Sequence, residues 1–115
     1  MREFIYAKRF DKSFDKLGLT DDDLIRIENI IIDNPSAGDV IEGTGGLRKV
    51  RYALPHQGKS SGTRVLYVDF AYYEIVYMID IYIKKEKDNL SDNEKTEIKK
   101  VLKVIENNLR SGSYE

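Results

Sequence analysis

Cysteine and tryptophan are absent from this sequence of 115 residues, and histidine occurs once. Without cysteine the chain has no disulfide, no thiolate nucleophile and no zinc–thiolate site. One histidine, His56, cannot build a multi-histidine metal centre. Three consecutive aspartates at 21–23 stand at an expected helix start, where carboxylates bind first-turn amides more often than a cation. We therefore expect neither a metal nor a cofactor in the functional site.

Long apolar segments are missing as well. No apolar run approaches the roughly 20 residues that span a bilayer, and residues 1–8 lack the apolar core of a signal peptide. The composition, 41% hydrophobic and 34% charged, is that of an ordinary globular protein with one core. We therefore expect one domain over residues 1–115, in the cytoplasm and without a membrane partner.

Acidic residues are missing from one segment of the chain. The net charge is −1, yet no Asp or Glu occurs between Gly43 and Val68. The same segment carries five cations, namely Arg48, Lys49, Arg51, Lys59 and Arg64. A basic segment in an otherwise slightly acidic protein suits the phosphate backbone of a nucleic acid. The alternative is that these cations form only a solvated surface.

Apolar spacing and turn residues predict three helices and four or five strands. Thr20 with Asp23, and Ser91 with Glu94, have the spacing of a capping box, so each pair marks a helix start. The expected helices cover residues 10–17, 20–34 and 91–111, and the expected strands cover residues 3–8, 47–54, 63–70 and 73–83, with a short extended piece near 40–41.

Strands joined by short loops should pair antiparallel, with the N-terminal strand added to the sheet and the helices covering one face. Alternation along residues 47–54 places Lys49 and Arg51 on the same face. In the strand 73–83, alternation places five residues on one face, namely Ile75, Tyr77, Ile79, Ile81 and Ile83. Asp80, Tyr82 and Lys84 are then expected together on the opposite face.

Three motifs, in this order along the chain, carry a family resemblance. They are Gly-Thr-Gly-Gly-Leu-Arg-Lys-Val-Arg at 43–51, Gly-Lys-Ser-Ser-Gly-Thr-Arg-Val-Leu-Tyr at 58–67 and Ile-Tyr-Ile-Lys-Lys-Glu-Lys-Asp-Asn-Leu-Ser at 81–91. With the order of elements, they resemble the RelE/ParE toxin superfamily, and within it the RelE-like and HigB-like toxins of type II toxin–antitoxin modules. The resemblance implies an α+β fold, with two N-terminal helices and a C-terminal helix packed on a twisted, mainly antiparallel sheet of four to five strands.

The resemblance also implies an activity and partners. RelE-like toxins are mRNA interferases, that is, ribosome-dependent and metal-independent endoribonucleases that cleave mRNA and so inhibit translation. The implied partners are the ribosome, mRNA and a cognate antitoxin protein with a helix-turn-helix DNA-binding domain.

The residue pattern of the family falls on specific positions of this chain. Its two basic residues separated by one correspond to Lys49 and Arg51, and its arginine before a Val/Leu-Tyr pair corresponds to Arg64. Its basic pair at the end of the last strand corresponds to Lys84 and Lys85, followed by Glu86, with a lysine in place of an arginine. Tyr82 is the nearest substitute for a tyrosine that RelE carries shortly after this point. We expect Arg48, Lys59 and Lys87 to bind RNA without taking part in the chemistry.

Metal-free RNA cleavage needs a base for the 2′-hydroxyl, donors for the phosphate and an acid for the leaving oxygen. Arg51 and Arg64 suit the phosphate, because a guanidinium meets two oxygens at once. Lys49 suits the base if neighbouring cations favour its neutral form, and Tyr82 or Glu86 suits proton relay.

Three alternatives stay open at this point. The residues could bind phosphate without chemistry; the chain could be a ParE-like toxin that inhibits a DNA topoisomerase; or it could be a non-catalytic RNA-binding module. The antitoxin is expected either on the basic surface or on the acidic N-terminal helices, the second being slightly favoured.

Overall fold

The computed structural model describes residues 1–53, 62–84 and 89–112. Three α-helices and five strands follow one another as β1 (Glu3–Tyr6), α1 (Lys8–Lys16), α2 (Asp21–Asp33), β2 (Asp39–Val40), β3 (Arg48–Tyr52), β4 (Thr63–Phe70), β5 (Ile75–Ile83) and α3 (Asp92–Ser111). A short 3-10 turn, Ala71–Tyr73, joins β4 to β5. None of the helices in these ranges is long and apolar enough to cross a membrane.

The strands form one sheet in the order β1-β5-β4-β3-β2. β1 pairs parallel with β5, and the other three pairings are antiparallel. The predicted α+β class, the five strands and the addition of the N-terminal strand to the sheet are therefore confirmed.

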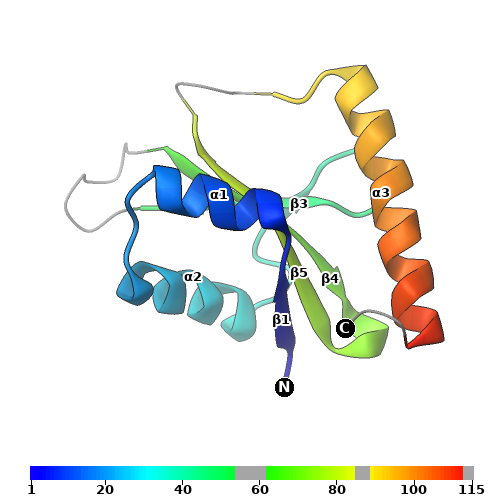
Figure 1. The fold of residues 1–115 in the computed structure, drawn as a ribbon, viewed down its shortest axis with the longest axis horizontal. Helices are drawn as coiled ribbons and strands as arrows, with labels where there is room; N and C mark the ends of the chain where they lie inside the picture. The colour runs from blue at the N-terminus through cyan, green and yellow to red at the C-terminus, as the bar shows by residue number, and fades with distance from the viewer. Residues whose placement is uncertain (54–61, 85–88, 113–115) are drawn as a thin grey trace.

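The prediction that the helices cover one face of the sheet is wrong. α1 and α2 lie on one side of the sheet and α3 on the other (Figure 1). Two separate core clusters explain the arrangement. Phe10 and Ile31 of α1 and α2 pack with Val50 and Tyr67 of the sheet. Leu102 of α3 packs with Leu66 and Val68 of β4 and with Leu47, which directly precedes β3.

The helix boundaries follow the local sequence signals. Thr20 and Asp23 form the predicted capping box at the start of α2, and Ser91 and Glu94 form the one at the start of α3. α3 ends at Gly112, whose φ of 77° lies in the left-handed region that glycine adopts without steric cost. These signals are contained within a few residues, which is why the sequence alone predicts them.

A β-bulge in β5 overturns the predicted alternation of that strand. Leu66 of β4 pairs with Asp80 and Tyr67 pairs with Met78, so Ile79 has no partner in the register. One extra residue in a strand moves every following side chain to the other face. Ile81 therefore packs with Met78 in the first core cluster, whereas we expected it with Ile79.

Asp80 fixes the bulge to α1. Its buried carboxylate accepts hydrogen bonds from the hydroxyl of Ser13 at 2.7 Å and from the backbone N–H of Ile81 at 2.8 Å. The Nε of Arg9 lies 2.9 Å from its other oxygen. A buried carboxylate is stable only when its oxygens are satisfied in this way. Asp80 is therefore a structural residue, although alternation placed it beside Tyr82.

Candidate functional site

Three of the predicted site residues form a row across the sheet. Arg51 of β3 pairs with Arg64 of β4, and Arg64 pairs with Tyr82 of β5. Residues directly opposite one another on neighbouring strands point to the same face, with their Cβ atoms about 4.5–5.5 Å apart. Arg64 shares its face with Leu66 and Val68, because side chains alternate along a strand. The row therefore lies on the α3 side of the sheet, near the start of β4.

Two more cations lie beside this row. Lys49 is two residues before Arg51 on β3 and so shares its face, opposite Leu66. Lys84 is exposed, and its backbone N–H donates to the carbonyl oxygen of Gly62 at 2.9 Å. This bond ties the end of β5 to the start of β4. The bulge in β5 is what brings Tyr82 to the face that Lys49 and Arg51 share.

Within the described part of the chain, the cations in and beside the row have no carboxylate partner. Lys49, Arg51 and Arg64 form no ion pair with any acidic group in residues 1–53, 62–84 and 89–112. The one hydrogen bond found for Arg64 in those ranges is a long one, 3.4 Å from its Nη1 to the carbonyl oxygen of Thr63. Two opposed like charges destabilise a sheet. A negatively charged ligand between the two arginines removes that cost.

Three arginines outside the row, Arg2, Arg9 and Arg26, do have acidic partners. Arg2 makes a two-point contact with Asp69, its Nε and Nη2 lying 2.8 Å and 3.1 Å from the carboxylate oxygens. Arg9 pairs with Asp80, as described above. Arg51 and Arg64 have no such partner within residues 1–53, 62–84 and 89–112, so their guanidiniums can bind an external anion.

Arg48 lies apart from the row, on the other face of β3. It faces the same side as Val50, and its Nη1 donates to the carbonyl oxygen of Gly38 at 2.6 Å. Its predicted role in RNA binding would therefore have to operate from a different surface than that of Lys49. The remaining predicted residues lie outside the described residues, namely Lys59, Lys85, Glu86 and Lys87.

Three groups with shifted pKa values belong to the packing of α1 and α2 on the sheet. Burial raises the pKa of Tyr67, whose hydroxyl donates to the carbonyl oxygen of Pro35 at 2.8 Å. Burial likewise raises the pKa of Tyr52, which donates to Asp23 at 3.1 Å. The backbone N–H of Thr20 lowers the pKa of Asp23, mainly by donating to its carboxylate. All of these groups lie on the α1–α2 side of the sheet.

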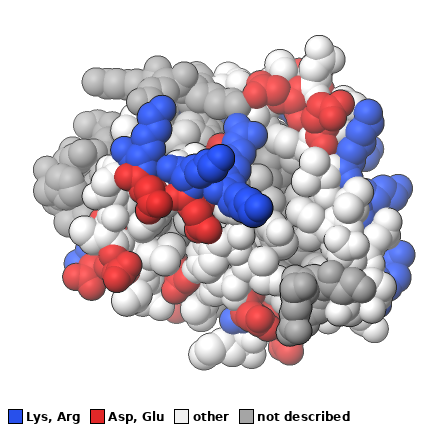
Figure 2. All heavy atoms as spheres, in the orientation of Figure 1, with Lys and Arg blue, Asp and Glu red and all other residues white. Residues whose placement is uncertain are grey.

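Basic side chains are not confined to the segment between Gly43 and Val68. Figure 2 shows them over α1 and along α3, with acidic side chains between and beside them. Lys8, Arg9 and Lys12 contribute to the first group. Charge counted along a segment of the sequence does not reveal such a surface, because a helix separates its charges by face.

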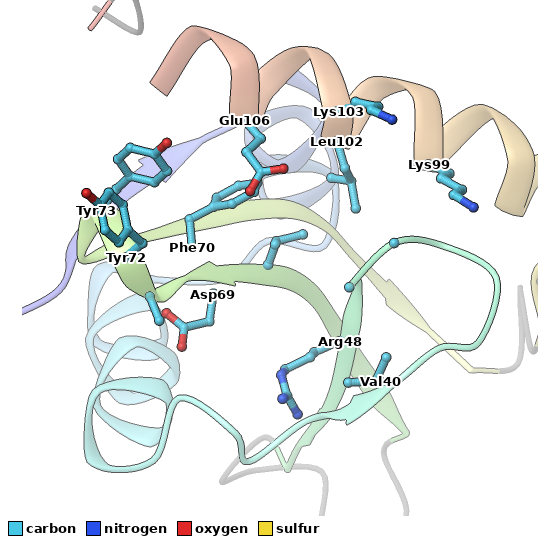
Figure 3. Close-up of a pocket in the computed structure, with 14 residues that line it drawn as sticks. Val40, Arg48, Asp69, Phe70, Tyr72, Tyr73, Lys99, Leu102, Lys103 and Glu106 are labelled. Carbon is cyan, nitrogen blue, oxygen red and sulfur yellow. The ribbon is translucent and has the colours of Figure 1, made fainter. Parts of the chain in front are cut away.

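A cavity of about 450 Å³ lies at the opposite end of β4 from the row. Figure 3 shows Lys99, Leu102 and Lys103 of α3 on one side of it, and Arg48 and Val40 on the other. No motif in the sequence indicated this cavity, because its walls come from segments that are about 60 residues apart.

Comparison with known proteins identifies the family. Residues 1–111 match the model of the family described as the RelE toxin of the RelE/RelB toxin–antitoxin system. The chain belongs to the RelE toxin family. The match covers nearly the whole RelE-like chain, so the resemblance drawn from the three motifs is confirmed.

Solved structures of RelE from E. coli share the fold of this family member. The isolated E. coli RelE toxin is 17% identical, with a TM-score of 0.54, over 88% of this chain and 99% of that one. A mutant of E. coli RelE in the free state is 16% identical, with a TM-score of 0.54, over 76% and 87%. The toxin in the intact E. coli RelBE toxin–antitoxin complex is 19% identical, with a TM-score of 0.53, over 70% and 94%.

Proposed function

We propose that this RelE-family toxin is a ribosome-dependent endoribonuclease that cleaves mRNA and is neutralised by an antitoxin. The observation that carries the proposal is the row of Arg51, Arg64 and Tyr82. It sets side by side two guanidiniums that have no acidic partner within the described residues, and the nearby hydroxyl can exchange a proton. Family membership supports the toxin role. The proposed site of action is the cytoplasm, where ribosomes translate.

The proposed reaction is attack of an RNA 2′-hydroxyl on the adjacent phosphorus. The new bond joins the 2′-oxygen to phosphorus, and the bond from phosphorus to the 5′-oxygen of the next nucleotide breaks. Arg51 and Arg64 hold the non-bridging oxygens, whose negative charge grows in the transition state. These two cations supply the charge stabilisation for which other nucleases use a metal ion.

Two protons move in this reaction. Lys49, in its neutral form, is the proposed base that takes the proton of the 2′-hydroxyl, because it lies on the same face two residues from Arg51. Tyr82 is the proposed acid that protonates the leaving 5′-oxygen, since it stands at the other end of the row, beside Arg64. Glu86 is a second candidate for proton relay, from the sequence alone.

The ribosome is proposed to orient the RNA. In-line attack needs the 2′-oxygen, the phosphorus and the leaving oxygen in one line, and holding reactants in such a geometry accelerates a reaction strongly. The row supplies positive charges and a group that can exchange a proton, on an exposed face of the sheet. We infer that the ribosomal decoding site holds the mRNA strand against this row.

Single-turnover cleavage tests the proposal. The purified protein is mixed with ribosomes programmed with a labelled mRNA, and with the same mRNA alone. We expect rapid cleavage on the ribosome and little on naked RNA. An Arg51→Gln variant should lose the ribosomal cleavage, whereas Lys100→Gln, an exposed cation on α3, serves as the matched control and should retain it.

Two outcomes would overturn the assignment. Growth arrest with intact messages and blocked replication would favour a toxin that inhibits a topoisomerase. Tight binding of free RNA without cleavage on the ribosome would favour a non-catalytic RNA-binding module.

A further inference from the structure

The third strand of the sheet stops short of its neighbour and leaves part of β4 unpaired. β3 pairs with β4 up to Arg48 and Tyr67, whereas β4 continues to Phe70 along β5. Along three residues, Val68, Asp69 and Phe70, β4 therefore has a neighbour on one side only among the described strands. Successive residues of a strand direct their backbone groups to alternate sides. At least one of the three thus points its N–H and C=O into the open edge.

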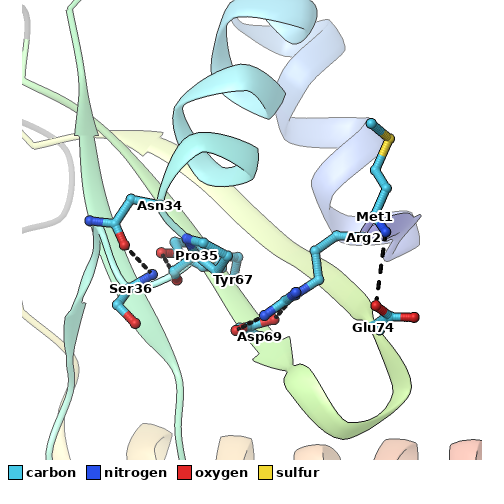
Figure 4. Close-up of polar contacts among 8 residues, drawn as sticks. All are labelled: Met1, Arg2, Asn34, Pro35, Ser36, Tyr67, Asp69 and Glu74. Carbon is cyan, nitrogen blue, oxygen red and sulfur yellow. Dashed lines mark hydrogen bonds and ion pairs between the residues drawn. The ribbon is translucent and has the colours of Figure 1, made fainter.

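This open edge forms one wall of the cavity of about 450 Å³. Val68 and Phe70 face α3, because they pack in the cluster around Leu102. Asp69 faces the opposite side, where Arg2 holds it in the two-point contact drawn in Figure 4. A strand added here would point its side chains alternately toward α3 and toward the other face.

The charges around the edge are mainly positive. Lys99 and Lys103 line the cavity from α3, and neither forms an ion pair within the described part of the chain. Arg48 lines it from the other face. Of the two acidic residues in the lining, Asp69 is neutralised by Arg2, which leaves Glu106. Three cations against one free carboxylate favour an acidic occupant.

Two exposed apolar side chains flank the same cavity. Tyr72 is 90% exposed and Val40 is 54% exposed, and they stand on either side of the open edge. An exposed tyrosine and valine beside unpaired backbone groups are what an interface with another polypeptide buries. A free phosphate or nucleotide would use the cations and leave both the edge and the apolar side chains unused.

We propose that the open edge of β4 binds an extended, acidic segment of the antitoxin by strand addition. The segment pairs its backbone with Val68–Phe70, over about 10 Å at 3.4 Å per residue. Its acidic side chains on the α3 side meet Lys99 and Lys103. This inference rests on the proposed role of the protein as the toxin of a two-protein module. It places the antitoxin at the end of the sheet away from Arg51, Arg64 and Tyr82.

The position predicts that binding and catalysis can be separated by mutation. The candidate antitoxin is the protein encoded in the adjacent reading frame. The double variant Lys99→Glu/Lys103→Glu should bind this protein at least about tenfold more weakly, because both attractive charges become repulsive. Lys100→Glu, at an exposed position of the same helix that does not line the cavity, is the matched control and should bind within about twofold of the wild type.

Two readouts make the test independent of the nuclease assignment. Affinity is measured by calorimetry with full-length proteins, and hydrogen exchange follows the amides of 68–70, which should be protected on binding. In cells, the double variant should still arrest growth but resist rescue by the adjacent-frame protein. Arg64→Gln should show the reverse, with no arrest and normal binding.

Several results would overturn the inference. They are unchanged affinity of the double variant, no protection of the amides of 68–70, or no binding of the adjacent-frame protein to the wild type. A wild-type dimer that the double variant abolishes would instead assign the edge to a second copy of this chain. If the toxin shows no nuclease activity but the double variant still loses affinity, the docking site stands and only the proposed reaction fails.

Discussion

Replacement of Arg64 by glutamine should separate activity from stability. Arg64 lies between Arg51 and Tyr82 in the row, and its guanidinium has no acidic partner among the described residues. Glutamine keeps part of the aliphatic stem that packs on the sheet and removes the charge. We therefore expect cleavage to fall while the fold is retained.

The expected changes in cleavage rate and in free energy of unfolding differ in size and in sign. Loss of one donor to a developing anionic charge slows a reaction by about 10²- to 10³-fold, or roughly 2.7–4 kcal/mol of barrier. Removal of one of two opposed like charges in a sheet should stabilise the free protein by a few tenths of a kcal/mol, at most about 1 kcal/mol. A residue that packs the core would show the opposite sign, with stability falling together with activity.

Single-turnover cleavage on programmed ribosomes gives the first quantity, and urea unfolding followed by circular dichroism gives the second. Arg110→Gln, an exposed change near the end of α3, is the control for loss of a positive charge and should change neither by much. The role of Arg64 as a donor to the phosphate is contradicted if Arg64→Gln cleaves at more than about a tenth of the wild-type rate, or if the variant loses more than about 1 kcal/mol of unfolding free energy.

Three further changes test other parts of the structure. Tyr82→Phe should lower the single-turnover rate by about 10²-fold with unchanged ribosome binding by co-sedimentation, and equal loss of both would make Tyr82 an anchor rather than an acid. Asp23 has a lowered pKa in the folded protein, so its contribution to stability is present above about pH 3.9 and is lost as the pH falls through the lower folded value. Asp23→Asn should flatten the fall in unfolding free energy at acid pH, and parallel acid-unfolding curves for both proteins would contradict this. Ile31→Ala should lower the free energy of unfolding in urea by about 2–5 kcal/mol, because the side chain of Ile31 is fully buried between α2 and the sheet. A loss below about 1 kcal/mol would show instead that neighbouring side chains fill the cavity.

The parts of the fold that depend on neighbouring residues could be predicted from the sequence. The capping boxes at Thr20 and Ser91, and the shared face of Lys49 and Arg51, are set by spacing within one element. The family pattern then placed Arg64 and Tyr82 with the two basic residues, and the register of the sheet brings all four to one face.

The parts that depend on contacts distant in the sequence could not be predicted. The unpaired Ile79 in β5 becomes visible only when β4 is aligned with it, and no propensity at that position indicates a bulge. Alternation along β3 already directs Arg48 away from the row, but its hydrogen bond to Gly38 lies in a connection that the sequence describes only as glycine-rich. The division of the helices between two faces likewise depends on which apolar stripe meets which side of the sheet.

The order of the strands also determines when the sheet and the row can assemble during synthesis of the chain. β5 is the last of the five strands to be synthesised, yet it lies between β1 and β4 in the sheet. Glu3 of β1 therefore cannot pair until Ile75 of β5 has been synthesised. Tyr82 reaches Arg64 only with this same strand. Until β5 has emerged from the ribosome, a nascent chain therefore has neither a complete sheet nor a complete row. Such long-range pairing is slow to form, so the row is completed only late in folding.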